Sequence, residues 1–166
     1  MLTKNFYSFM RAALQKTSAT FTLRSGSTNA FSYVSSNSTA PFEALEIWGD
    51  GQTNVKGVSF GIGTTPATTS DYCLESILGS TQISVSVPSA VSYSRGDAFD
   101  EYSVSFGVTN ITAEAITISE VGLIATPSSA NYVLVDRTVL DTPVTIPAGQ
   151  SKQITYTIRF NYGDAV

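Results

Sequence analysis

Apolar and polar side chains alternate one by one along several stretches of the chain, most clearly at Ile154–Phe160. The same pattern runs over Ile83–Val87 and over Tyr102–Phe106, and Val108 continues the apolar face of the latter stretch. Because successive side chains of a strand point to opposite faces of a sheet, this period of two predicts strands with one buried and one solvent-facing side. Turn residues such as Pro147–Gln150 separate the stretches, which favours antiparallel pairing.

Further strands are expected on both sides of these stretches. Ile116 and Ile118 share one face, whereas Val121 and Leu123 share the other, and this change of phase predicts a β-bulge or a strand bend near residues 119–120. The other expected strands lie near Phe21 and Leu23 and at Phe31–Tyr33 and Val55–Gly61, and Tyr132–Val135 and Arg137–Leu140 together form the next extended run. The expected loops and turns are residues 35–41, 48–51 and 61–70, and Glu43–Trp48 is ambiguous.

The beginning of the chain has helical periodicity instead. A helix over residues 3–16, with Thr3 as its N-cap, would carry one apolar stripe. A helix of this length is marginal in water, so its stripe must pack against something. Two alternatives are open: the stripe covers the open end of the β-domain, or it packs on another subunit. The candidate assembly contacts on this stripe are Leu2, Phe6, Phe9, Met10 and Leu14.

These patterns predict a mainly β chain with a short N-terminal helix. Residues 1–18 are expected to form an amphipathic docking segment, and residues 19–166 a single antiparallel β-sandwich of immunoglobulin-like or jelly-roll-like type. The length of 166 residues is enough to bury a core. No segment approaches the roughly 18–20 continuous apolar residues that span a membrane, and no secretory signal is expected.

The composition is poor in charge. Charged residues make up 13% of the chain and apolar residues 42%, so Ser and Thr supply most of the polar surface, as is typical of extracellular and virion β-proteins. The net charge is −4, yet residues 1–42 contain four basic and no acidic residues. This basic end would dock on an acidic neighbour or on nucleic acid, or is simply a solvated surface. Nucleic acid is not expected as a partner, because the acidic remainder repels phosphate.

The residue types for most catalytic and metal chemistry are missing. The chain has no histidine, which removes the usual general base, the Ser–His and Cys–His nucleophilic pairs and most transition-metal sites. Cys73 is the single cysteine, so no intrachain disulfide can form, and we interpret it as a buried small residue. We therefore expect no enzyme activity, no catalytic residues and no cofactor.

Two groups of carboxylates are the remaining candidate sites. Asp97, Asp100 and Glu101 lie in one expected loop and carry the oxygen ligands that Ca²⁺ takes. Asp71 and Glu75 carry the two carboxylates that a glycosidase needs, although nothing in the sequence supplies a sugar cleft beside them. Acidic loop residues are most often solvated, and we expect no metal site and no glycosidase.

Two weaker patterns concern sugars. Trp48 with Asp50 and Asn54 would make a small carbohydrate platform, although a lone tryptophan more often lies in a core or an interface. The sequons Asn37–Thr39 and Asn110–Thr112 have a meaning only in a protein secreted by a eukaryotic cell.

Three segments resemble virion proteins of tailed bacteriophages. Gly61–Glu75 combines a Gly/Thr/Pro loop with an Asp-Tyr-x-Leu-Glu run, and Thr117–Ile124 resembles the Glu-Val/Ile-Gly-Leu strand of phage tail, fibre and head-surface proteins. Asp136–Gln150 is the third segment, and the Met1–Tyr7 opening is also similar. The resemblance implies a virion component and transfers no catalytic residue. Head decoration protein, head fibre, tail fibre anchor and tail or neck component all stay open.

The expected function is therefore that of a non-enzymatic structural subunit in a virion, with other virion proteins as partners. The alternative is a module that binds a host surface or a carbohydrate, which exposed aromatic residues near Trp48 or Tyr93 would favour. Glu120, at the expected bulge and just before Gly122, either shapes an intersubunit surface or faces solvent.

Overall fold

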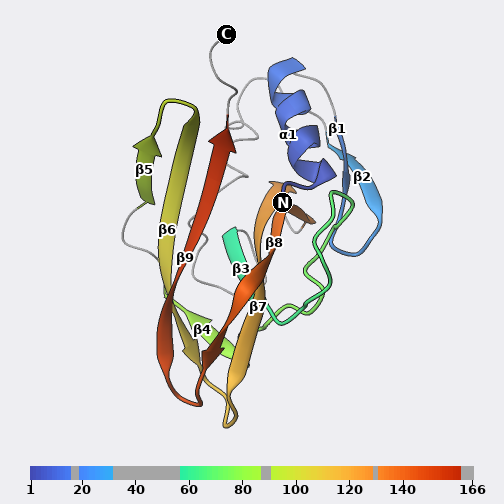
Figure 1. Cartoon of the computed structure of the whole chain (residues 1–166). Helices are drawn as coiled ribbons and strands as arrows, with labels where there is room; N and C mark the ends of the chain where they lie inside the picture. The colour runs from blue at the N-terminus through green and yellow to red at the C-terminus, as the bar shows by residue number, and fades with distance from the viewer. Residues whose placement is uncertain (16–18, 32–56, 87–90, 129–130, 162–166) are drawn as a thin grey trace.

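The computed structural model describes residues 1–15, 19–31, 57–86, 91–128 and 131–161 (Figure 1). This part of the chain is mainly β, with antiparallel strands and one short helix near the N-terminus, α1 (Lys4–Gln15). The strands are β1 (Ala19–Thr22), β2 (Thr28–Phe31), β3 (Gly57–Gly61), β4 (Ile83–Val85), β5 (Val91–Arg95), β6 (Phe99–Asn110), β7 (Ile116–Ser128), β8 (Asn131–Ile146) and β9 (Ser151–Asn161). None of the helical residues described is in a helix long and apolar enough to cross a membrane.

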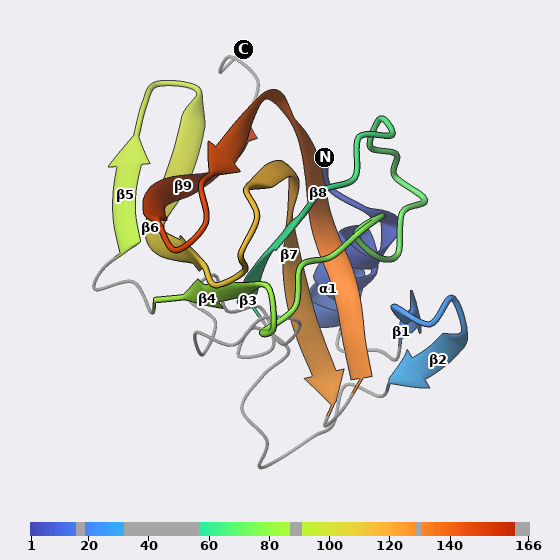
Figure 2. The ribbon, with the colours of Figure 1, turned by 90° about the horizontal axis from the view of Figure 1, so that it is seen from below.

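The described strands form two larger sheets and one small one. β3, β7 and β8 pair in that order, and β6 pairs with β9 on one side and with β4 and β5 on the other. β1 and β2 form a hairpin of their own beside α1. Figures 1 and 2 show the two larger sheets side by side, with α1 next to β1 and near β8.

Side chains of both larger sheets meet in one hydrophobic core. The alternation expected for the last strand is confirmed, because Ile154, Tyr156 and Ile158 are buried whereas Thr155 and Thr157 are exposed. The other fully buried members of this core from β3, β4, β6, β7 and β8 are Phe60, Ile83, Val104, Phe106, Val108, Ile118, Leu123, Ala125, Val133, Val135 and Ile146.

The predicted change of phase near residues 119–120 is present in β7. The pairing with β8 shifts from Ile118–Val144 to Glu120–Val139, with one residue of β7 and four of β8 between these pairs, and Ile118 and Val121 lie in the same core. In a regular strand Glu120 would share the core face with Ile118, because residues two apart share a face. The irregular pairing thus leaves the Glu120 side chain outside this core, on the opposite face of the sheet.

The predicted N-terminal helix is also confirmed. Phe6 is 7% exposed and belongs to the main core, and Leu2 and Met10 are partly buried against the same core. The stripe therefore covers the chain's own β-structure at these three positions, whereas the side chains of Phe9 and Leu14 lie outside the described residues. A contact of this helix with another subunit stays a prediction.

Thr3 precedes the helix as expected, but its side chain serves another element. Its carbonyl accepts the N–H of Phe6, whereas its hydroxyl donates to the Leu134 carbonyl of β8 at 2.6 Å. The side chain of Asn5 also donates to the Leu134 carbonyl. It bonds to β1 as well, accepting from the Thr22 N–H and donating to the Thr22 carbonyl. These buried side chains bind the start of the helix to β8 in one sheet and to β1 in another.

The extended run expected over Tyr132–Val135 and Arg137–Leu140 is confirmed, because both parts lie in one continuous strand, β8. One strand was missed. β5 was not expected, because most of its side chains are exposed and only Val91 and Tyr93 mark its inner face. The expectations for residues 35–41 and for Glu43–Trp48, including the turn at 48–51, fall outside the described residues.

Candidate functional site

A buried polar site surrounds Glu120, on the face of β7 opposite the main core. Glu120 is fully buried, and its carboxylate accepts four hydrogen bonds. Three come from the backbone N–H groups of Gly63, Glu75 and Ser76, at 3.1, 3.1 and 2.8 Å. The fourth comes from Arg137 Nε of β8 at 2.8 Å. An ionised carboxylate has about four acceptor sites, so this carboxylate is fully satisfied without water.

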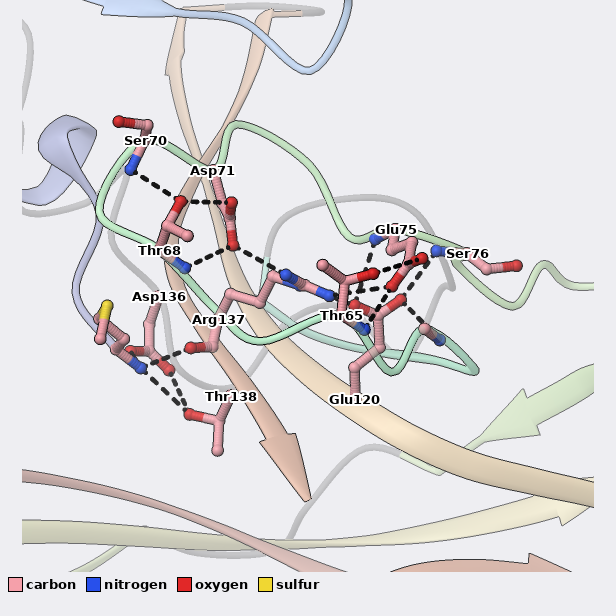
Figure 3. A network of polar contacts seen from close by, with 12 residues as sticks. Thr65, Thr68, Ser70, Asp71, Glu75, Ser76, Glu120, Asp136, Arg137 and Thr138 are labelled. Atoms are coloured by element: carbon pink, nitrogen blue, oxygen red, sulfur yellow. Dashed lines mark hydrogen bonds and ion pairs between the residues drawn. The ribbon is translucent and has the colours of Figure 1, made fainter. Parts of the chain in front are cut away.

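Arg137 joins Glu120 to two further carboxylates. Its side chain is 4% exposed, and its two terminal nitrogens contact Asp71 Oδ2 at 2.8 Å and Glu75 Oε2 at 3.4 Å. Figure 3 shows the guanidinium between these carboxylates and Glu120. The fixed fork of the guanidinium binds three carboxylates in one plane, which a lysine ammonium would not do. We call Glu120, Arg137, Asp71 and Glu75 the Arg137 network.

The same carboxylates shape the loop that follows β3. Glu75 accepts from both the N–H and the hydroxyl of Thr65 at 2.9 Å, and Asp71 accepts from the N–H and the hydroxyl of Thr68 at 3.0 and 2.7 Å. Residues 62–76 form no named strand, yet their backbone is bonded at several points to charged side chains (Figure 3). The network therefore replaces sheet pairing as the element that orders this loop.

Two glycines make the close approach of loop and carboxylate feasible. A Cβ atom at Gly61, which lies opposite Glu120 across β3 and β7, would be 2.5 Å from Glu120 Oε1. A Cβ atom at Gly63 would be 2.6 Å from the same oxygen and 2.5 Å from Glu75 Cβ. Both positions must lack a side chain because the carboxylate occupies that space.

The pKa shifts describe a site built for charged carboxylates. Hydrogen bonds from Thr65 lower the pKa of Glu75, with Arg137 adding to the effect. Burial, the largest effect at Asp71, raises its pKa, but hydrogen bonds from Thr68 and Arg137 outweigh burial and leave the pKa of Asp71 lowered. A general acid needs the opposite, a carboxyl whose pKa is raised. Asp71 and Glu75 do lie together, as a glycosidase pair would, but on a shared arginine that keeps both charged.

A second polar cluster ties the N-terminal segment to both larger sheets. The buried Asp136 carboxylate binds the Met1 amino group at 2.9 Å and accepts a hydrogen bond from the Tyr156 hydroxyl, with 3.0 Å between the two oxygens. Burial, followed by the charge of Asp136, raises the pKa of Tyr156 well above its usual value. Since Asp136 belongs to β8 and Tyr156 to β9, this bond also links the two sheets.

The residues considered for calcium do not converge. Asp100 binds Arg95 at 2.7 Å, and Glu101 binds Arg159 at 2.6 Å. Asp100 and Glu101 are neighbours in β6, so their side chains lie on opposite faces of the sheet. Within the described ranges, no group of three or more His, Cys, Asp or Glu side chains is arranged to hold a metal ion.

The remaining sequence candidates have structural surroundings or fall outside the described residues. Cys73 is half-buried, and burial raises the pKa of its thiol. Asn110 is fully buried and its amide donates to the carbonyls of Glu114 and Ile146, so this sequon asparagine is part of the core. Trp48, Asp50, Asn54 and the sequon at Asn37 are not among the described residues.

The sequence did not predict that Glu120 pairs with Arg137. Glu120 does not face solvent, because it is fully buried within the chain. A role of this part of β7 in shaping an intersubunit surface stays a prediction. One signal was present: Glu120 and Arg137 are opposite charges in two expected strands that are rich in apolar residues, and charges buried in such strands are normally paired. The contribution of Asp71 and Glu75 had no such signal, because both lie in a loop.

No family model, no curated protein and no solved structure matches this chain.

The buried Arg137–Glu120 pair can be compared directly with the exposed Arg159–Glu101 pair, which is also an arginine–glutamate ion pair. Replacing Arg137 by Met leaves three carboxylates without their shared cation, and we expect this change to lower the free energy of unfolding by about 3–5 kcal/mol. Arg159→Met removes the exposed partner of Glu101, and we expect a loss of about 1 kcal/mol or less. Urea unfolding followed by circular dichroism measures both variants. Equal losses would show that the buried network contributes no more than a surface pair.

The lowered pKa values predict a stability that declines in acid. Carboxyls with lowered folded-state pKa values stabilise the fold fully above their ordinary pKa values, 4.5 for Glu75 and 3.8 for Asp71, and lose that contribution as the pH falls further. We expect Asp71→Asn to be less stable than wild type near neutral pH and to show a shallower decline below about pH 4. Unfolding in urea at a series of pH values measures the slope. Parallel slopes for the two proteins would contradict this role of Asp71.

Proposed function

We propose that this protein is a structural subunit of a bacteriophage virion, which assembles on the head or tail through contacts with other virion proteins. We further infer that its two larger sheets form a β-sandwich of immunoglobulin-like or jelly-roll-like type. Support for the sandwich comes from the single core that the inward side chains of β6 and β9 share with those of β3, β7 and β8.

The observation that carries the proposal is where the phage-like segments lie in space. Gly61–Glu75 supplies Asp71 and Glu75, Thr117–Ile124 supplies Glu120, and Asp136–Gln150 supplies Arg137. Three segments far apart in the sequence therefore meet in one network around the buried pair of Glu120 and Arg137. The contacts of this network lie within the chain, which favours a framework role over the binding of a small molecule.

The outer face of the β4–β5–β6–β9 sheet suits contacts between subunits. Neighbouring strands pair hydroxyls across this face, at 2.7 Å in each of the pairs Ser103–Thr157, Ser105–Thr155 and Thr109–Ser151. Over these rows β6 and β9 place no charged side chain on this face. Such a surface can be covered by another protein without the large cost of burying an unpaired charge.

A carbohydrate-binding or host-surface module is the second candidate, and one observation favours it. Tyr93 is 50% exposed, its ring lies 5.1 Å from that of Tyr102, and its hydroxyl donates to Asp100. The Arg95 guanidinium lies 5.8 Å from the Tyr93 ring centroid. An exposed aromatic ring beside charged hydrogen-bonding groups is a surface on which a sugar ring can stack.

Antibodies against the recombinant chain test the virion proposal. We expect the chain to be enriched in phage particles that are purified from the source culture on a density gradient, in a constant ratio to the major particle protein. Absence from the particles would overturn the proposal. A glycan array separates the second candidate, because only a carbohydrate-binding module would lose a glycan signal on Tyr93→Ala and keep it on Tyr7→Ala, a change at a similarly exposed tyrosine of α1.

A further inference from the structure

β9 is a long strand with a single described neighbour. It pairs with β6 from Ser151 to Asn161 without any shift of register. Its 11 residues exceed the usual strand length of about 5–6 residues. The strand contains no proline and no bulge, so its outer edge is straight and complete in backbone donors.

The backbone hydrogen bonds of β6 show which groups of β9 point outward. Asn110 of β6 exchanges backbone bonds with Gly149 and Gln150, on the β9 side, whereas the Gly107 carbonyl accepts from Ser86, on the β4 side. Since alternate residues of a strand direct their backbone groups to opposite neighbours, even-numbered residues of β6 bond to β9. Their partners in β9 are also even-numbered. The outward N–H and C=O groups of β9 therefore belong to Ser151, Gln153, Thr155, Thr157, Arg159 and Asn161.

The other sheet edges in the described structure are covered or short. The Met1–Thr3 segment bonds to the first half of β8, and Pro143, which lacks an N–H, lies in its second half. Ser76 and Leu78 bond to the outer side of β3 and the residue after it. β4 and β5 have three and five residues. Natural sheets protect their edges in these ways. Among the described residues, β9 is neither covered nor short and has no proline, although it carries two charged side chains, Lys152 and Arg159.

We propose that β9 pairs antiparallel with β9 of a second copy of this chain, about a two-fold axis at Tyr156. This inference deepens the proposed assembly function and rests on it. Full overlap of the two 11-residue strands places Ser151 opposite Asn161, and Ile154 opposite Ile158. The interface is then isologous, with the same strand in both copies, as in most two-fold dimers. The two sheets join into one continuous sheet across the axis.

The side chains of β9 are compatible with their own two-fold copy. In this register Thr155 faces Thr157 of the second copy, which adds hydroxyl pairs to the row that β6 and β9 already form. Arg159 faces Gln153 and Lys152 faces Phe160, so no like charges oppose each other. A second copy thus fits this edge without the repulsion that opposed like charges cause.

Proline at position 157 tests the pairing, with valine at the same position as the matched control. The Thr157 N–H points away from β6, so Thr157→Pro removes an intermolecular donor and keeps the intrachain ladder. Both variants lose the hydroxyl bond to Ser103 equally. In light scattering we expect wild type and Thr157→Val at twice the 17.6 kDa chain mass, and Thr157→Pro at the chain mass. A dimer that persists in Thr157→Pro, or a monomeric wild type, would overturn the proposal.

Amide hydrogen exchange supplies a readout that does not depend on a variant. In the dimer, the outward amides of Gln153, Thr155 and Thr157 should exchange as slowly as those of Ile154 and Tyr156, which bond to β6. Fast exchange at the outward amides contradicts the pairing. Protection that arises only when other particle proteins are added would assign this edge to a different chain and overturn the second-copy proposal.

The two tests separate this inference from the function on which it rests. A chain that is enriched in phage particles but monomeric in solution, with fast outward amides, refutes the β9 pairing and leaves the virion proposal standing. A β9 dimer that is absent from particles refutes the virion proposal and supports the pairing.

Discussion

The ion pair between Glu120 and Arg137 is the interaction on which the organisation of this β-structure depends. Both side chains are buried, and removing one partner of such a pair leaves an uncompensated charge in a medium of low polarity. All four acceptor sites of Glu120 are used, three of them by backbone N–H groups that have no sheet partner to bond instead. The pairing of Glu120 on β7 with Arg137 on β8 and the ordering of the loop after β3 therefore depend on one another.

The irregular pairing of β7 with β8 next to Glu120 makes this arrangement compatible with a hydrophobic core. Ile118 and Val121 both lie in the main core, whereas the Glu120 side chain lies on the other face of β7, where Ile124 belongs to a second, smaller apolar cluster. Gly61 and Gly63 then leave room for the carboxylate against the loop backbone. The buried pair also specifies the register of β7. A slip of one residue would place Glu120 among apolar side chains.

The spacing of apolar residues predicted much of the fold, because helices and half-buried strands each have a characteristic period of apolar and polar side chains. The N-terminal helix, the alternation of β9 and the phase change at residues 119–120 follow from side-chain spacing alone. β5 was missed because its exposed side chains carry little pattern. The Arg137 network was missed for another reason: Asp71 and Arg137 lie 66 residues apart, and only the pairing of strands brings them together. The residues named as a carboxylate pair were correctly grouped, but their shared partner gives them a structural role.

Amide hydrogen exchange at Gly63, Glu75 and Ser76 tests the central role of the Glu120 carboxylate most directly, because these three N–H groups donate to it. We expect all three amides to exchange as slowly as amides in the centre of β7, since the loop can open only when the buried ion pair is broken. Exchange at the rate of exposed loop amides would contradict it, because the loop would then open without disturbing Glu120 and Arg137.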